Sequence, residues 1–202
     1  MGTLNQSLFL AGAVKNLTDI SNIIEVGALD VGSGNNFRGK FHGANYVGVD
    51  ISAGTNVDIV LDFSESNICD SRGWESKFDL AICCSMLEHT FTPWKVADNI
   101  TKAVKPGGHA YISVPFVWRF HGYPSDYWRF SPECVKALFS EFEVVEMMYA
   151  TTCKGEFHAI GADPREIDSA IAIELKNGTE AKYTRKYLPY LSVEFLGRKN
   201  HV

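Results

Sequence analysis

Two glycines one residue apart follow an apolar segment near the N-terminus, in the run Leu29-Asp30-Val31-Gly32-Ser33-Gly34. Glycine has no Cβ, so the backbone can turn tightly there and a ligand can approach it closely. A second apolar segment ends at Asp50. In a parallel sheet an acidic side chain at such a place can accept hydrogen bonds from both hydroxyls of a ribose. Together, the two features indicate a site for a ligand that contains a ribose.

The residues around the glycines favour a cationic ligand over a dinucleotide. A dinucleotide-binding fingerprint has a third Gly or Ala three residues after the second glycine. This chain has Phe37 there, and that ring would crowd a diphosphate. Asp30 adds a negative charge beside the turn, which suits an ammonium or a sulfonium better than a pyrophosphate. An NAD-dependent oxidoreductase is therefore the disfavoured interpretation.

A second polar group lies in the segment His-Gly-Tyr-Pro-Ser-Asp-Tyr-Trp-Arg-Phe, residues 121–130, which follows a predicted strand. Ligands bind outside the carboxyl ends of strands in open α/β sheets. We therefore expect the segment from Arg119 to Arg129 to form one wall of a substrate pocket. His121 is the first candidate for a catalytic base, because an imidazole titrates near neutral pH. Tyr123 and Tyr127 are candidate substrate contacts.

Two pairs of residues have both a functional and a structural interpretation. Asp126 and Arg129 are candidate substrate ligands, but their spacing of three also allows them to pair with each other on one turn. In the pair Glu88-His89, His89 is the second candidate base. For that pair the structural interpretation is favoured over a direct catalytic role.

Short apolar runs alternate with helix-like stretches, which is typical of α/β proteins with a mostly parallel sheet. The predicted strands are Gly27–Val31, Asn45–Asp50, Val57–Leu61, Phe78–Cys84, His109–Val114, Val144–Tyr149 and Tyr190–Arg198. The predicted helices are Asn5–Leu17, Pro93–Val104, Pro132–Phe139 and Asp163–Glu174. A Thr or Ser precedes Pro93 and Pro132 and is expected to cap the helix there. Lys105-Pro106-Gly107-Gly108 is expected to end the middle helix and turn into the next strand.

Length and composition limit the class of protein. The chain has 202 residues, of which 46% are hydrophobic and 21% charged, as in an ordinary globular protein. One domain over residues 1–202 is expected, with an insertion of unknown role at about residues 153–190. The net charge of −5 argues against nucleic acid as a partner, and no apolar run is long enough to span a membrane. Five cysteines in no metal-binding spacing, with no signal peptide, predict reduced thiols in a cytoplasmic protein.

The chain resembles the class I S-adenosylmethionine (SAM)-dependent methyltransferases over roughly residues 24–149 and in its last strand. Five segments carry the resemblance in the order of the family's motifs: Leu29–Gly34 resembles the first motif, Asp50 the ribose-binding acid, Asp62-Phe63 the adenine-contacting pair, Phe78–His89 the fourth-strand motif and Val104–Gly108 the turn before the fifth strand. Residues 121–130 are also similar to a subgroup that has a His-Gly-x-Pro-x-Asp-Tyr-x-Arg-Phe segment after the fifth strand.

This resemblance implies a fold and a cofactor. The fold is a Rossmann-like, doubly wound, seven-stranded sheet that is mostly parallel, with an antiparallel last strand, in a single α/β domain. The cofactor is S-adenosyl-L-methionine. The residues expected to bind it are Asp30, Gly32, Ser33, Gly34, Asp50, Ile51, Asp62, Phe63 and Ser85.

Two departures from the family's pattern affect the expected site. Asn36 stands where many members have a third glycine, and residues 36–44 are too few for the long helix that usually follows the first motif. We therefore expect a truncated helix there. Ubiquinone O-methyltransferases have a Glu three residues before a Glu-His pair, in a metal site, where this chain has Ser85. Because one anionic ligand is missing, we expect no metal site and catalysis without a divalent ion.

The expected reaction is transfer of a methyl group from SAM to a small polar acceptor. A substrate oxygen, nitrogen or carbon would attack the sulfonium methyl in line, and the protein would align the two partners. Tyr123, Asp126, Tyr127 and Arg129 are the expected acceptor contacts. The alternative from another class is a non-catalytic module that binds SAM or another nucleotide. The sequence predicts no oligomeric state.

Overall fold

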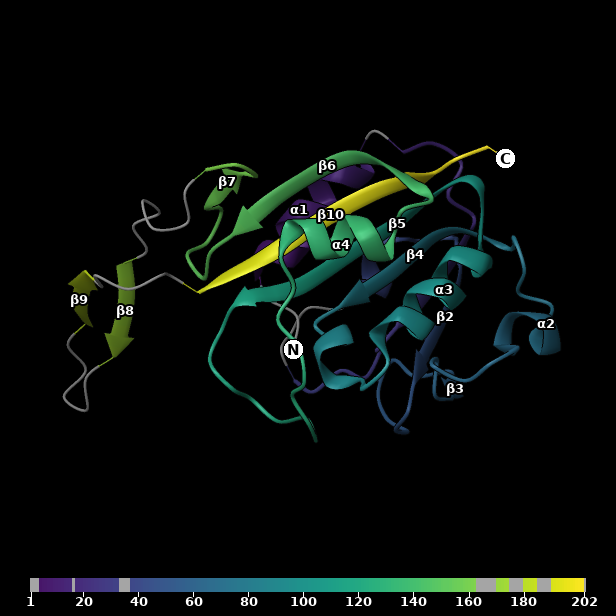
Figure 1. Ribbon diagram of the computed structural model, residues 1–202, viewed down its shortest axis with the longest axis horizontal. Helices are drawn as coiled ribbons and strands as arrows, with labels where there is room; N and C mark the ends of the chain where they lie inside the picture. Colours follow the sequence, from purple (N-terminus) through teal and green to yellow (C-terminus); the bar gives the residue numbers. More distant parts are fainter. Residues whose placement is uncertain are drawn as a thin grey trace.

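One mixed sheet of eight strands organises the protein (Figure 1). The structure is a computed structural model that describes residues 4–15, 17–32, 37–162, 170–174, 180–184 and 190–201. The strand order is β3-β2-β1-β4-β5-β10-β6-β7. The bounds are β1 Asn22–Val26, β2 Asn45–Asp50, β3 Ile59–Val60, β4 Phe78–Cys84, β5 Val104–Val117, β6 Phe142–Ala150, β7 Phe157–Ala159 and β10 Leu191–Lys199. The first five strands of the sequence pair in parallel, and β10 is antiparallel to both of its neighbours, β5 and β6.

This sheet confirms the predicted Rossmann-like architecture, and β7 is the strand that the prediction lacked. β7 pairs antiparallel with β6 at the edge of the sheet. Strands β8 (Ala170–Glu174) and β9 (Glu180–Thr184) form a second, two-stranded sheet. The helix predicted over Asp163–Glu174 is therefore wrong in its described part, residues 170–174. Apolar and small residues at those positions fit either element, and pairing with β9 selects the strand.

The first strand lies five residues before its predicted position. The prediction was Gly27–Val31, whereas β1 ends at Val26 and Gly27 follows with φ +82°. That backbone conformation suits glycine and ends the strand. Asn22 and Glu25 interrupt the apolar run of β1. Glu25 is nevertheless tolerated in the sheet because the Tyr46 hydroxyl donates to its Oε2 over 2.7 Å.

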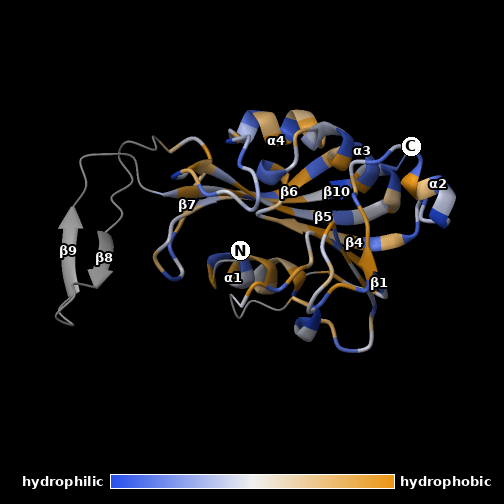
Figure 2. Cartoon of the chain, turned by 90° about the horizontal axis from the view of Figure 1, so that it is seen from below, coloured by the Kyte–Doolittle hydropathy of each residue, from blue (hydrophilic) through white to orange (hydrophobic). Residues whose placement is uncertain are grey.

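Helices cover both faces of the sheet (Figure 2). Helices α3 (Pro93–Ala103) and α4 (Pro132–Leu138) lie on one face, and α1 (Leu4–Val14) lies on the other. The Oγ of Ser131 accepts a hydrogen bond from the backbone N–H of Cys134 over 3.3 Å, so α4 has the predicted cap. Thr92 makes no such bond from its side chain, so α3 begins at Pro93 without one. Among the described residues, no helix is long and apolar enough to cross a bilayer.

Shorter elements complete the chain between the strands. Residues 38–40 form one 3-10 turn, η1, in agreement with the expected truncated helix. Helix α2 spans Ile68–Arg72, and a second 3-10 turn, η2, spans Leu87–His89. The predicted turn Lys105–Gly108 belongs to β5 itself, where Gly107 has φ +77° and the register with β4 shifts between Phe78 and Leu80. The turn is therefore an irregularity at the start of the strand.

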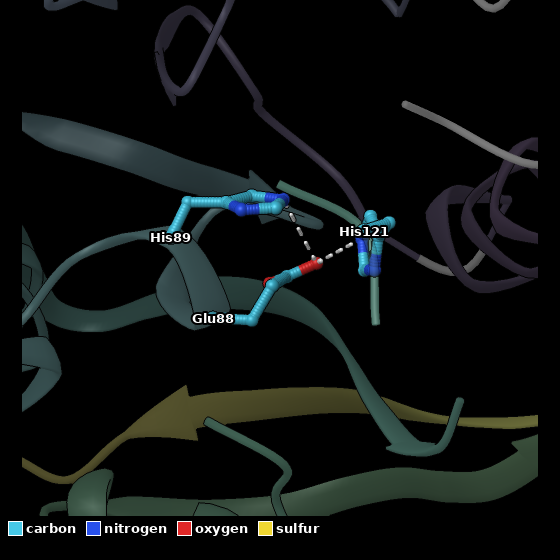
Figure 3. Close-up of side chains that lie close together, drawn as sticks. All are labelled: Glu88, His89 and His121. Atoms are coloured by element: carbon cyan, nitrogen blue, oxygen red, sulfur yellow. Dashed lines mark ion pairs between the residues drawn. The ribbon is translucent and has the colours of Figure 1, made fainter. Parts of the chain in front are cut away.

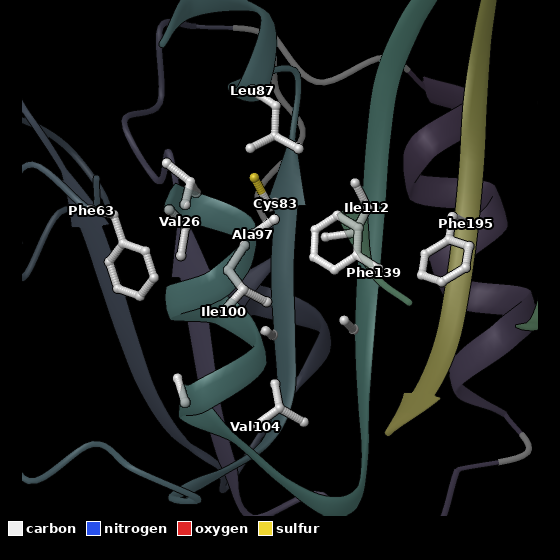
Figure 4. Packing of buried hydrophobic residues seen from close by; sticks show 14 of the residues in the cluster. Val26, Phe63, Cys83, Leu87, Ala97, Ile100, Val104, Ile112, Phe139 and Phe195 are labelled. Atoms are coloured by element: carbon white, nitrogen blue, oxygen red, sulfur yellow. The ribbon is translucent and has the colours of Figure 1, made fainter. Parts of the chain in front are cut away.

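Two apolar layers hold the sheet between the helices. In the first layer, α3 and α4 pack on β1, β4, β5 and β10 (Figure 4), with Val26, Cys83, Leu87, Ala97, Ile100, Val104, Ile112, Phe139 and Phe195 among the buried side chains. In the second layer, Phe9 of α1 stacks on Tyr111 of β5 with 5.5 Å between ring centroids. Each such buried side chain contributes about 1.5–3 kcal/mol. This rigid sheet aligns the carboxyl ends of β2, β1, β4 and β5 along one edge.

Candidate active site

A cavity of about 610 Å³ lies at that edge of the sheet, in the size range of small-molecule sites. Loops after β1, β2, β3, β4 and β5 line it. Of the predicted site residues, those that line the cavity are Asp30, Asp50, Ile51, Asp62, Phe63, Ser85, His89, His121, Tyr123 and Tyr127. Gly32, Asp126 and Arg129 are described but are not among the lining residues. Ser33 and Gly34 lie outside the described residues.

The carboxylate of Asp50 is fixed at the end of β2. Its Oδ2 accepts from the backbone N–H of Leu29 over 3.1 Å, and its Oδ1 accepts from that of Ser52 over 3.0 Å. Each carboxylate oxygen has a second lone pair that can accept from a ligand hydroxyl. Ile51 follows it and is 60% exposed. Asp50 can therefore hold the two hydroxyls of a ribose without moving.

Asp62 and Phe63 lie next to Asp50 along the cavity wall, just past β3. The Oδ1 of Asp62 accepts from the backbone N–H of Ser64 over 2.9 Å and from its hydroxyl over 2.7 Å. Phe63 is buried and stacks on Trp74 with 6.4 Å between ring centroids. The pair offers an acceptor and an apolar ring edge, which is what an amino-substituted purine needs.

Asp30 has a structural contact as well as a place in the cavity wall. Its Oδ1 accepts from the backbone N–H of Gly32 over 2.8 Å. This bond closes the turn that the glycine makes with φ +84°. Asp30 is therefore a turn-forming residue whose carboxylate also lines the cavity.

Glu25 and Gly27 are cavity residues that sequence reasoning missed. Glu25 and Gly27 have the same acid-x-Gly spacing as Asp30 and Gly32, five residues earlier in the chain. That repeated spacing was the signal in the sequence that could have identified them. Glu25 accepts hydrogen bonds from Tyr46 and, over 2.8 Å, from the Asn56 amide. Burial raises the pKa of Glu25 to about 7, against the opposing effect of those hydrogen bonds.

Ser85 ends β4 in a left-handed conformation, with φ +50°. Its N–H donates to the backbone oxygen of Ser113 over 2.8 Å, and its Oγ accepts from Gln6 Nε2 over 2.9 Å. Gln6 also donates to the Ser113 hydroxyl over 2.8 Å, and that hydroxyl donates to the buried Glu194 over 2.9 Å. Burial raises the pKa of Glu194, while its hydrogen bonds lower it. A polar network thus runs from α1 to the cavity edge.

The side chains of Glu88, His89 and His121 converge (Figure 3). Both histidines line the cavity, whereas Glu88 is buried and is not among the lining residues. The Nε2 atoms of His89 and His121 lie 3.7 Å and 3.9 Å from Glu88 Oε1. The two rings meet edge to face with 5.0 Å between centroids. Burial raises the pKa of Glu88 to about 7 and lowers the pKa of His89. The convergence brings together both predicted bases and adds a carboxylate.

Asp126 and Arg129 form the structural pair that their spacing allowed. Arg129 donates to both carboxylate oxygens, over 2.5 Å and 2.7 Å, and also to the backbone oxygen of Arg119. The guanidinium holds the pKa of Asp126 at about 2. Asp126 Oδ2 accepts from the backbone N–H of His121 over 2.7 Å. The pair therefore shapes the loop that carries His121.

Tyr123 and Tyr127 line the same end of the cavity as His89 and His121. Both rings are about half exposed and line the cavity. Tyr123 meets His89 edge to face at 6.4 Å, and Tyr127 meets Phe91 in the same way at 5.6 Å. The backbone N–H of Tyr127 donates to the Glu88 backbone oxygen over 2.8 Å, which ties the segment after β5 to η2.

Comparison with protein families matches residues 10–167 to a methyltransferase domain. Among curated proteins, the ubiquinone biosynthesis O-methyltransferase of Pectobacterium atrosepticum is 32% identical over 101 residues. The match covers 42% of this chain and 41% of that protein, so it spans less than half of the relative.

Solved structures share the fold at low sequence identity. One is the 1,6-didemethyltoxoflavin-N1-methyltransferase of Burkholderia thailandensis, with bound 1,6-didemethyltoxoflavin and S-adenosylhomocysteine (TM-score 0.61, 15% identity, 98% of this chain and 77% of that one). Another is a SAM-dependent methyltransferase from Archaeoglobus fulgidus (TM-score 0.61, 15% identity, 98% of this chain and 95% of that one). At these identities the likeness is one of fold.

Proposed function

This chain belongs to the methyltransferase domain family, and from that premise we propose that it transfers the methyl group of SAM to a small polar acceptor. One observation carries the proposal: a single cavity has Asp50 and Asp62 at one end and His89 and His121 at the other. Carboxylates that can hold a nucleoside and imidazoles that can accept a proton thus line one cavity.

The strand order supports this assignment of the two ends. The cavity residues follow β3, β2, β1, β4 and β5, which are neighbours in that order. From β2 to β5 there are three strand spacings, about 14 Å in total. A nucleoside held by Asp50 would extend past the loop after β1 toward Ser85, with its sulfonium near Glu25 and Asp30. The acceptor would then lie between that methyl group and His121.

The chemical step follows from this order. The acceptor's nucleophilic atom attacks the methyl carbon, the new bond to carbon forms as the carbon–sulfur bond breaks, and the electron pair stays on sulfur. A hydroxyl acceptor loses its proton to an imidazole Nε2 as it attacks. The tyrosine rings and the cavity volume of about 610 Å³ favour a small acceptor with polar groups.

Calorimetry and a methyl-transfer assay test the proposal together. We expect S-adenosylhomocysteine to bind and NAD not to bind. We also expect labelled methyl transfer from SAM to a member of a set of small polar metabolites. His121→Ala should lower turnover by about 10²-fold with little change in S-adenosylhomocysteine affinity. His158→Ala is the matched control, since His158 pairs with Glu156 outside the cavity. NAD binding, or an equal effect of both variants, would contradict the proposal.

A further inference from the structure

The three side chains at the acceptor end form a cluster with the composition of a metal site. One ligand atom from each of Glu88, His89 and His121 lies within 4.8 Å of the others. Both imidazoles point their Nε2 atoms at Glu88 Oε1 (Figure 3). Two imidazoles and one carboxylate are a common ligand set for divalent transition ions.

The other ring nitrogen of each histidine is held by an acceptor. His89 Nδ1 lies 2.6 Å from the Ser125 backbone oxygen. His121 Nδ1 lies 3.2 Å from the Arg119 backbone oxygen and 3.4 Å from Asp126 Oδ2. Because these oxygens only accept, each Nδ1 carries a proton, and in the neutral imidazole the lone pair is then on Nε2. Metal-binding histidines are oriented in this way by a second group.

Without a cation between them, the groups of the cluster do not satisfy one another. Neutral imidazoles with protons on Nδ1 have nothing to donate to the carboxylate of Glu88. The distances of 3.7 Å and 3.9 Å are also too long for hydrogen bonds. Glu88 is 1% exposed, and its Oε2 has no hydrogen-bond partner among the described residues. A buried carboxylate anion in that condition is unfavourable, and either a proton or a bound cation relieves it.

The distances fit an ion after a small contraction. Ligand atoms that lie 2.0–2.1 Å from a tetrahedral ion are roughly 3.3 Å from one another. The backbone N–H of Tyr127 donates to the Glu88 backbone oxygen and so ties the segment after β5 to η2. Within that segment, the backbone N–H of His121 donates to Asp126. To reach that separation from Glu88 Oε1, the two Nε2 atoms, now at 3.7 Å and 3.9 Å, would move closer by about 0.4–0.6 Å.

We propose that Glu88 Oε1, His89 Nε2 and His121 Nε2 bind one divalent transition ion of the zinc class, with an open position toward the cavity. The imidazole nitrogens disfavour Mg²⁺ and Ca²⁺, which prefer oxygen ligands. The expectation of no metal site rested on Ser85, which stands where ubiquinone O-methyltransferases have the other Glu of their metal site. The structure instead brings His121 to the Glu88-His89 pair from the segment after β5.

The role of the ion rests on the proposed function, whereas its binding does not. An acceptor hydroxyl at the open position would become more acidic, as hydroxyl groups do on such ions. Because both Nε2 atoms would then be bound to the ion, the hydroxyl proton would pass to water at the cavity mouth in place of an imidazole. The acceptor oxygen would form the bond to the methyl carbon, and the carbon–sulfur electron pair would stay on sulfur. The acceptor class is thus an alcohol or a phenol.

Metal binding is measured on the full chain, freed of metal by a chelator and without SAM. We expect one equivalent of Zn²⁺ by calorimetry, and visible absorption bands of a nitrogen- and oxygen-ligated ion when Co²⁺ is added. His121→Ala and the near-isosteric Glu88→Gln should each weaken Zn²⁺ binding at least tenfold, while His158→Ala should not. Circular dichroism checks that each variant is folded. Because His121 is on a loop, its variant keeps the test decisive if the Glu88 variant unfolds.

Several outcomes would overturn the site: no stoichiometric Zn²⁺ binding, equal affinity in the His121 variant, or Mg²⁺ binding as tight as Zn²⁺. The same samples are titrated with S-adenosylhomocysteine. Zn²⁺ binding without S-adenosylhomocysteine binding would leave the metal site and remove the proposed function. S-adenosylhomocysteine binding without Zn²⁺ binding, together with loss of turnover in the His121 variant, would overturn the metal site and leave His121 as the base.

Discussion

Gln6 of α1 donates a hydrogen bond to the Ser85 hydroxyl over 2.9 Å, although 79 residues separate them in the chain. Gln6 is 1% exposed, so the bond joins the first helix to the cavity edge from within the second apolar layer. The helix that covers one face of the sheet therefore also holds the residue that ends β4.

Replacing Gln6 with leucine tests this link. Gln6→Leu replaces the amide with an apolar side chain of similar size and leaves the hydroxyls of Ser85 and Ser113 without the Gln6 donor. We expect a loss of about 1–3 kcal/mol in the free energy of unfolding, measured with urea. Lys15→Ala, an exposed change just after the same helix, should stay within about 0.5 kcal/mol. Equal stability of the two variants would show that the bond contributes nothing.

Asp50 is expected to hold the ribose. Asp50→Asn keeps one acceptor for the backbone N–H groups but removes the charge. The affinity for S-adenosylhomocysteine should fall by about tenfold or more, because hydrogen bonds to a charged group contribute about 1.5–3 kcal/mol. Calorimetry measures the change, and Asp98→Asn on the exposed face of α3 is the matched control. A folded Asp50 variant with unchanged affinity would place the ribose elsewhere.

Glu25 should make stability depend on pH. Burial raises its pKa from 4.5 to about 7, so the protonated form fits the folded protein better than the anion does. The stability it contributes is complete below the unfolded pKa and is lost as pH rises through 7. Glu25→Gln removes this titration. Between about pH 4 and 8, the wild type should therefore lose about 3 kcal/mol relative to the variant. The free energy of unfolding of each protein is measured with urea at each pH. If it changes with pH in the same way for both proteins, the prediction is refuted.

Gly27 and Gly32 form a matched pair for the space beside the cavity. Both have positive φ, +82° and +84°, so alanine is strained at either position. At Gly27 a Cβ would lie 2.7 Å from Met86 Cβ, whereas at Gly32 it would have no atom of the described residues within 4 Å. Gly27→Ala should therefore destabilise the protein by about 1–3 kcal/mol more than Gly32→Ala. Thermal unfolding of both variants gives the comparison, and similar losses would mean that Met86 moves aside freely.

The sequence predicted well those parts of the fold that local pattern determines. Asp50 ends an uninterrupted apolar strand, and β2 and β4 have their predicted bounds. β1 was misplaced because Glu25 is polar in sequence but paired with Tyr46 in the sheet. Only a partner from another strand makes that residue compatible with burial, and no local pattern contains the partner.

The acceptor end could be predicted only as separate pieces. Glu88-His89 follows β4 and His121 follows β5, and adjacent parallel strands bring their carboxyl ends together. The convergence of the three side chains depends on how the segment after β5 returns. That return is set by the Tyr127 bond to Glu88 and by the Asp126–Arg129 pair. The sequence offered Arg129 for a substrate or for Asp126, and its two bonds to that carboxylate favour Asp126.

Strand β10 fills the position between β5 and β6 and supplies the antiparallel partner of both. During synthesis on the ribosome, β6 leaves the exit tunnel before β10 does, and the short strand β7 is the only other described strand that pairs with β6. The facing edges of β5 and β6 then remain unpaired and open to other chains until residues 191–199 emerge. Truncated nascent chains that stop before Leu191 should therefore be protease-sensitive across β6, and protection should appear in one step once β10 has been translated.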